Sequence, residues 1–196
     1  MSGFGSLSDT KARALGICAI ALLALIAVAA SIKVAPGPAG YLGAALALLM
    51  LAIAVIDARW LIIPDQLSAA GFALGLINAA VIAPQEMWQA AGIALARGAV
   101  LTLLFYGLRA LYRRLRGRQG IGLGDVKLAA VAGAWLDWLT MPIAIEIAAL
   151  SALGVIGIRY YGAGRLDAAL KFPVGLFLAP SIWACWLLEA TLLAPR

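Results

Sequence analysis

The stretch YLGAALALLMLAIAVID, residues 41–57, is a strongly apolar run that ends on a carboxylate. Its length approaches the ~20 residues with which an α-helix crosses the hydrocarbon of a bilayer. A charged side chain at the end of such a helix is costly to keep, so Asp57 marks a candidate functional site. The run therefore predicts a membrane helix with chemistry at one end.

The composition extends this prediction to the whole chain. Hydrophobic residues make up 65% of the 196 residues and charged residues only 12%, whereas a soluble domain carries roughly half apolar and a quarter charged residues. Seven apolar segments follow one another, and turn residues separate them. We therefore predict an all-α integral membrane protein, a multi-span bundle of about seven transmembrane helices whose fifth is short. The segments are 13–33, 40–58, 66–83, 88–112, 126–140, 142–160 and 172–193.

Basic residues predict the orientation of this bundle. With the N-terminus in the cytoplasm, the opposite side keeps only Lys33 and Arg196, and Arg97 lies inside the fourth segment. This asymmetry follows the positive-inside rule, so we do not expect the basic excess to bind nucleic acid. The orientation places Asp57 at the cytoplasmic face. The cytoplasmic basic residues are Lys11, Arg13, Arg59, Arg109, Arg113, Arg114, Arg116, Arg118, Lys127, Arg159, Arg165 and Lys171.

A second carboxylate lies at the same predicted depth. Asp125 belongs to Gly122-Leu123-Gly124-Asp125-Val126-Lys127-Leu128, where glycines lead into an apolar helix. Aspartate is a good N-cap, so Asp125 also has a purely structural interpretation. The functional interpretation rests on chemistry: two neighbouring carboxylates share a proton, so one activates water while the other protonates a carbonyl oxygen. Asp57 and Asp125 thus form a candidate dyad that needs no cofactor.

Other chemistry is restricted by composition. The chain has no histidine, which excludes Ser-His and Cys-His nucleophiles and histidine-bound metals. Cys18 and Cys185 lie singly in apolar runs, as inert buried thiols do. We therefore expect neither a metal nor a cofactor.

The neighbours of the two carboxylates have expected roles of their own. Glycines 122 and 124 allow an extended peptide to approach closely. Arg59 and Lys127 are expected to reach lipid head groups, with a possible tuning effect on the carboxylates. Asp65, after Pro64, is expected to cap the third helix. Arg97 is expected to pair with one of the acids near the outer face, which are Asp137, Glu146 and Glu189.

With these residues, the chain resembles the type IV prepilin peptidases, membrane aspartic proteases of the Gly-x-Gly-Asp class. Residues 122–128 match the second catalytic motif of that family, and Asp57 followed by Ile63-Pro64-Asp65 matches its first. The segment 172–179 looks like an imperfect version of the family's last helix. The resemblance covers residues 40–196, so 13–39 reads as an additional N-terminal helix and hairpin and 1–12 as a cytoplasmic tail.

The resemblance implies an aspartic endopeptidase of the bacterial inner membrane. It implies that Asp57 and Asp125 cleave the short leader from the N-terminal helix of prepilins or pseudopilins at the cytoplasmic face, as in type IV pilus assembly and protein secretion. The particular substrate and the oligomeric state stay open. Larger family members carry paired Cys-x-x-Cys motifs and also N-methylate the new terminus; this chain lacks those cysteines, so we expect no methyltransferase activity.

Three alternatives compete with this interpretation. A presenilin-like intramembrane protease shares Gly-Leu-Gly-Asp but usually has tyrosine before the first aspartate, where this chain has Ile56. A proton-coupled transporter would use the same acids as relays, although it favours carboxylates near the bilayer midplane. A non-catalytic assembly subunit is a third class, against which the intact aspartates argue.

Overall fold

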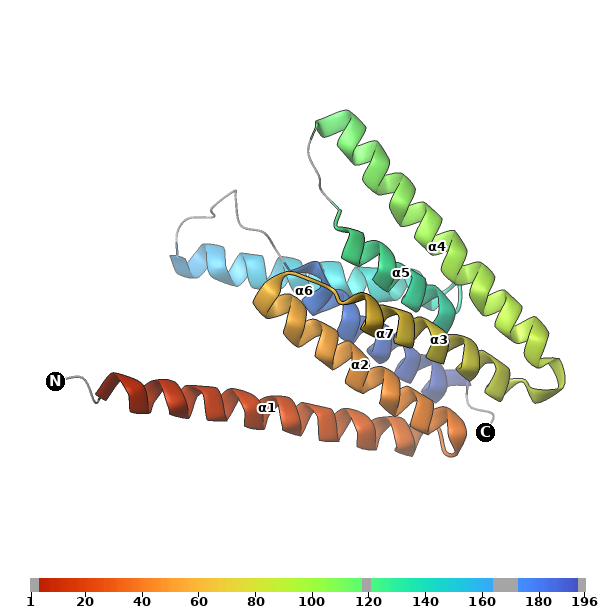
Figure 1. The fold of residues 1–196 in the computed structure, drawn as a ribbon, viewed down its shortest axis with the longest axis horizontal. Helices are drawn as coiled ribbons and strands as arrows, with labels where there is room; N and C mark the ends of the chain where they lie inside the picture. The colour runs from red at the N-terminus through yellow and green to blue at the C-terminus, as the bar shows by residue number, and fades with distance from the viewer. Residues whose placement is uncertain (1–3, 118–120, 164–172, 194–196) are drawn as a thin grey trace.

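The structure is a computed structural model that describes residues 4–117, 121–163 and 173–193. These ranges contain seven α-helices and one short 3-10 turn (Figure 1). The predicted all-α fold is confirmed. Phe172 of the late motif lies outside the described residues, as do Arg118, Arg165 and Lys171. The elements are α1 (Phe4–Val34), α2 (Pro38–Trp60), α3 (Asp65–Ile82), η1 (Pro84–Glu86), α4 (Met87–Arg116), α5 (Leu123–Trp135), α6 (Thr140–Ala163) and α7 (Val174–Leu193).

Six of the helices are long and apolar enough to cross a membrane, namely α1, α2, α3, α4 with the preceding turn, α6 and α7. The predicted fifth segment forms α5, which has only 13 residues and is therefore shorter than a bilayer requires. Helix α5 nevertheless occupies the inside of the bundle, because it packs against α3, α4 and α7. Most of its side chains are buried, from Val126 to Trp135.

The core of the bundle depends on close packing at small residues. A Cβ added to Gly43 on α2 would lie 1.8 Å from the Trp186 ring, and one added to Gly133 on α5 would lie 2.7 Å from the backbone of Gly98 on α4. Such contacts let membrane helices approach closely, where dispersion forces hold them. Trp135 joins the core by packing edge-on against Trp186 and donating a hydrogen bond to the carbonyl oxygen of Gly71 on α3, at 2.8 Å.

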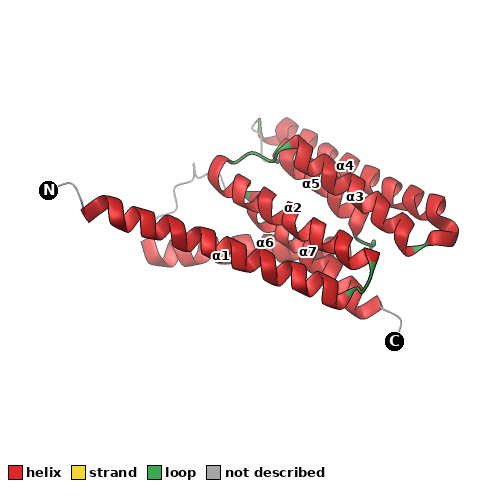
Figure 2. Cartoon of the chain, turned by 60° about the horizontal axis from the view of Figure 1, so that its bottom comes forward, coloured by secondary structure: helices red, strands yellow, loops and turns green. Residues whose placement is uncertain are grey.

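Helix α1 lies along one side of the bundle, where it contacts α2 and α7 (Figure 2). Trp183 of α7 donates its ring N–H to the hydroxyl of Ser31 on α1, at 3.0 Å. Because the helices run up and down, α2 and α4 end at the same end of the bundle at which α3, α5 and α7 begin (Figure 1). This end holds both candidate carboxylates.

Candidate active site

Asp57 lies in the last turn of α2 and is 5% exposed. The helix ends just beyond it, because Leu61 adopts a left-handed conformation with φ 55° and its N–H bonds to the carbonyl oxygen of Asp57. Residues 61–64 then run as non-helical chain toward α3. Asp57 therefore lies where the membrane helix ends and irregular backbone lines a cavity. Membrane proteins tolerate irregular backbone at such positions.

The N-terminus of α7 holds the carboxylate of Asp57 in place. The backbone N–H of Leu176 donates to its Oδ2 at 3.0 Å, and the backbone of Gly175 also bonds to the side chain. The first N–H groups of a helix have no intrahelical partner and favour negative charge nearby. A Cβ on Gly175 would lie 2.8 Å from that same Oδ2, so glycine permits this approach.

Asp125 is held at the start of α5 in a similar way. Its Oδ2 accepts a hydrogen bond from the backbone N–H of Gly122 at 3.0 Å, the carboxylate half of a capping box. Gly122, and not Asp125, is the N-cap residue of α5; Asp125 is the third residue of the helix and bonds back to the N-cap N–H. This structural role coexists with the position of Asp125 on a cavity wall. Gly124 allows α5 to approach the 61–64 segment, because a Cβ there would lie 2.7 Å from the Cδ1 of Ile63.

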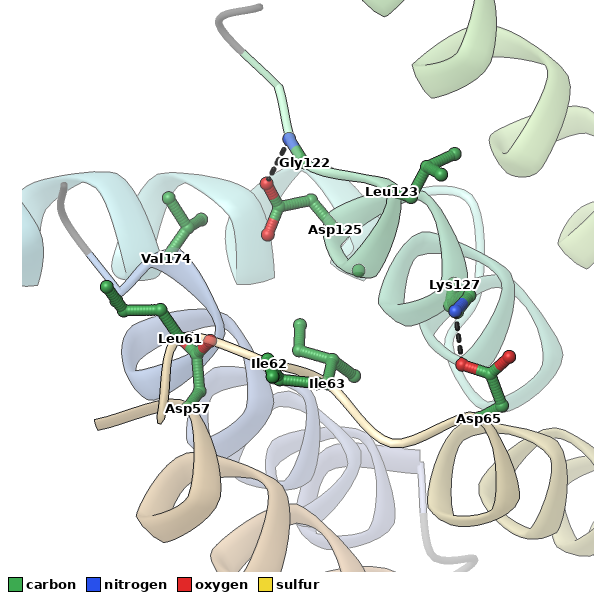
Figure 3. Close-up of a pocket in the computed structure, with 11 residues that line it drawn as sticks. Asp57, Leu61, Ile62, Ile63, Asp65, Gly122, Leu123, Asp125, Lys127 and Val174 are labelled. Atoms are coloured by element: carbon green, nitrogen blue, oxygen red, sulfur yellow. Dashed lines mark hydrogen bonds and ion pairs between the residues drawn. The ribbon is translucent and has the colours of Figure 1, made fainter. Parts of the chain in front are cut away.

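The structure brings the predicted site residues together around one cavity of ≈ 430 Å³ (Figure 3). Asp57 reaches it from α2 and Asp125 from α5, although 68 residues (125 − 57) separate them in the sequence. The volume is many times the ~30 Å³ that one water occupies in the liquid. The cavity can thus hold water together with part of a peptide. Its other lining residues are Leu61, Ile62, Ile63, Asp65, Gly122, Leu123, Gly124, Lys127 and Val174.

The two carboxylates also interact electrostatically. Asp125 lies outside the six candidate spans, and burial raises the pKa of its carboxyl above the usual range. The Gly122 hydrogen bond opposes this rise in pKa, the charge of Asp57 adds to it, and the guanidinium of Arg109 opposes it. A raised pKa next to a second carboxylate is the setting in which a pair keeps one proton.

The two cations expected to tune the dyad lie differently. Lys127 forms an ion pair with Asp65 across the cavity (Figure 3), while Arg59 is exposed in the last turn of α2. The predicted cap of α3 by Asp65 is wrong: Pro64 is the N-cap residue, without a side-chain cap bond, and Asp65 is the first residue of the helix. The carboxylate of Asp65 instead accepts a hydrogen bond from Lys127, and this ion pair links α3 to α5.

Three features of the site escaped the sequence analysis. Arg109 was counted only as a cytoplasmic charge, yet it donates to the carbonyl oxygen of Ile121 at 3.1 Å and acts on Asp125. The N–H groups of residues 175 and 176 act through the backbone, which no side-chain pattern reveals. Ile63 fills the space against two glycines, 124 and 175. Only the glycine of the late motif was a visible signal.

The predicted salt bridge of Arg97 is confirmed at the other end of the bundle, where its guanidinium pairs with Asp137. Of the two cysteines, Cys185 is buried as expected and Cys18 is exposed. Across the described ranges, no group of three histidine, cysteine, aspartate or glutamate residues is arranged to hold a metal ion.

Comparison with known proteins finds leader peptidases among the relatives. The chain is 30% identical over 129 residues to the leader peptidase HopD of Salmonella typhimurium, covering 66% of this chain and 81% of that protein. It is 30% identical over 166 residues to the prepilin leader peptidase/N-methyltransferase of Aeromonas hydrophila (83% and 54%). It is 36% identical over 156 residues to that of Burkholderia pseudomallei (73% and 45%). The chain thus spans about half the length of these two longer relatives. No solved structure matches it significantly.

The profile described as the type IV leader peptidase family matches residues 44–158. This range contains Asp57, Asp125 and the two glycines, 122 and 124, that precede Asp125, but it ends before α7. The match covers 115 residues (158 − 44 + 1), more than half of the 196 in the chain. The chain belongs to the type IV leader peptidase family and is a multi-pass membrane protease of the aspartic type.

Proposed function

We propose that this protein cleaves the N-terminal leader from prepilin-like or pseudopilin-like substrates, with Asp57 and Asp125 as the catalytic dyad. The observation that carries the proposal is the shared cavity, which both carboxylates line from different helices. Support for the substrate class comes from the relatives, of which several are prepilin leader peptidases.

The proposed reaction is the addition of water to a peptide bond. One carboxylate takes a proton from water as the oxygen attacks the carbonyl carbon, and the other donates its proton to the carbonyl oxygen. A tetrahedral diol results. Its collapse breaks the C–N bond, restores the carbonyl and passes a proton to the leaving amine, so the pair again shares one proton.

The surroundings of the dyad suit these steps. The backbone N–H of Leu176 donates to Oδ2 of Asp57, and the backbone of Gly175 also bonds to this carboxylate. The Gly122 N–H fixes the rotamer of Asp125. Such pre-positioning removes the need to reorganise the carboxylates during the reaction.

The cavity walls favour a substrate that combines polar and apolar parts. Leu61, Ile62 and Val174 provide apolar contacts beside the carboxylates, and these residues lie at the ends of membrane-spanning helices. A leader that precedes a hydrophobic helix presents its scissile bond at this depth. We place this end of the bundle at the cytoplasmic face, because the basic residues gather there.

The test is leader cleavage by purified or co-expressed protein acting on a candidate prepilin. We expect Asp57→Asn and Asp125→Asn each to lower the cleavage rate about 10²–10⁴-fold, since amides neither accept nor donate the proton. Glu146→Gln is the matched control, because Glu146 is exposed on α6, away from the cavity. Full activity in either aspartate variant overturns the dyad. Failure of the wild type on a panel of prepilins and pseudopilins overturns the substrate class.

A further inference from the structure

A second cavity, of ≈ 560 Å³, lies at the end of the bundle opposite the two aspartates. It is bounded where α1, α3 and α5 end, where α2 and α4 begin, and by the last turns of α7. Most of its wall consists of alanine, isoleucine and tryptophan side chains. Its polar residues are few, and they are Asn78, Arg97, Asp137 and Glu189.

The charges around this cavity leave an excess of carboxylate. The only lining cation among the described residues, Arg97, pairs with Asp137 through Nη1, while its buried Nε–H has no hydrogen-bond partner among these residues. Glu189 accepts hydrogen bonds at Oε1 from the backbone N–H of Asp137, at 2.7 Å, and from the hydroxyl of Thr140. Neither donor carries a charge, and the one cation that acts on Glu189, Arg97, is shared with Asp137, so one cation faces two carboxylates.

A second observation points to a donor entering from the cavity. Asn78 is 4% exposed, and its Oδ1 is buried with no hydrogen-bond partner among the described residues. Buried acceptors are rarely left unpaired, because desolvation without a replacement bond is costly. Asn78 lines the cavity, so a donor bound there lies on the side of α3 that carries this amide.

The helix ends add to the preference for positive charge. Helices α1, α3 and α5 present their C-termini at this cavity and α7 its last turns, whereas α2 and α4 present N-termini and α6 begins beside Glu189, at Thr140. The C-terminal end of a helix carries partial negative charge. Carboxylates and helix ends therefore favour a cation, while the apolar walls favour a hydrocarbon chain.

We propose that this cavity binds a membrane phospholipid with a primary ammonium head group. The ammonium donates to the Glu189 carboxylate and toward Asn78. An acyl chain of the lipid lies along the wall formed by Trp135 and Trp186. The depth fits, because the cavity lies at the ends of the membrane-spanning helices, level with the head groups. Binding here is independent of leader cleavage, so the proposal does not rest on the proposed function.

The experiment measures lipid retention by native mass spectrometry. The purified full chain is equilibrated in detergent with equal amounts of phosphatidylethanolamine, phosphatidylcholine and phosphatidylglycerol of identical acyl chains. We expect the wild type to retain the ethanolamine lipid about fivefold over the glycerol lipid, since one charge near a membrane surface is worth ~1 kcal/mol. We expect a similar factor over the choline lipid, since a hydrogen bond contributes about 1 kcal/mol. The choline lipid tests the need for N–H donors, because its ammonium has none. The glycerol lipid tests the need for a cation, because its head group has none. Equal retention of the three lipids overturns the proposal.

Variants locate the lipid at this cavity. Glu189→Gln should lose the preference, while Glu146→Gln on the exposed face of α6 should keep it. Ala90→Phe fills the cavity from α4 and should lower retention of the ethanolamine lipid without touching Glu189. It provides the test if Glu189→Gln does not fold. An unchanged preference in folded Glu189→Gln or Ala90→Phe, judged by elution profile and helical circular dichroism, overturns the assignment. Displacement of the lipid by millimolar free ethanolamine would show that the acyl chain contributes nothing to binding. This result would also overturn the proposal.

Discussion

At the scale of single residues, the site depends on backbone groups as much as on the two aspartates. Asp57 is buried, and a buried carboxylate needs hydrogen bonds to offset its lost hydration. Those bonds come from residues 175 and 176 at the start of α7. The geometry of the proposed dyad is therefore set partly by a glycine 118 residues away in the sequence (175 − 57).

Replacing this glycine tests the role of the backbone contact. In Gly175→Ala, the new Cβ would lie 2.8 Å from Oδ2 of Asp57 and 2.9 Å from Ile63, so the carboxylate must shift. A misplacement of ~1 Å can cost ~10²-fold in rate, and we expect leader cleavage to fall about 10–100-fold. The control is Gly154→Ala on α6, where an added Cβ meets nothing within 4 Å. Equal rates for both variants would contradict this role of Gly175.

Arg109 provides a prediction about pH. Burial raises the pKa of Asp125, and the charge of Arg109 lowers it, so Arg109→Gln should raise this pKa further. The limb of the pH–rate profile that reports Asp125 should then move to higher pH, whichever proton role Asp125 has. Arg113→Gln, an exposed arginine one turn further along α4, is the control. The profile of kcat/KM against pH measures the shift, and a limb that stays in place or moves to lower pH would contradict it.

At the scale of elements, hydropathy predicted most of the helices because the bilayer demands long apolar runs. The boundaries were less accurate where capping decides them. Asp65 was assigned as a cap from its residue type, but Pro64 takes that position and Asp65 turns to Lys127. The site was predictable only in part: Asp57 and Asp125 stand out as charges in apolar surroundings, whereas the α7 N–H groups and Arg109 act across distances that sequence patterns do not contain.

The end of α2 gives a prediction about stability. Leu61 adopts a left-handed conformation, which costs a non-glycine residue roughly 1–2 kcal/mol. Because glycine adopts this conformation freely, Leu61→Gly should raise the free energy of unfolding by about 0.5–1 kcal/mol. Leu111→Gly, at an exposed position more than one turn before the end of α4, should lower it by a similar amount. Thermal unfolding in detergent measures both, and a lower midpoint for Leu61→Gly than for the wild type would refute the argument.

At the scale of the whole molecule, the two ends of the bundle are chemically different. One end gathers the aspartates at the N-termini of α3, α5 and α7, where helix dipoles stabilise negative charge. The other gathers C-termini around the second cavity. The two proposals therefore assign peptide binding to one end of the bundle and lipid binding to the other, and both depend on which membrane face each end meets.

The distribution of basic residues predicts that the aspartate end meets the cytoplasm. Arg59, Arg109 and the arginines in the last turn of α4 lie at that end, whereas the only cations described near the other end are Lys33 and the paired Arg97. Positive charge is retained on the cytoplasmic side during insertion. Single cysteines test the orientation in a chain whose own two cysteines are replaced. A membrane-impermeant maleimide should label Gln85→Cys in intact cells and label Arg116→Cys only after permeabilisation. The reverse pattern would place the aspartates on the outer face, where a leader that stays in the cytoplasm cannot reach them.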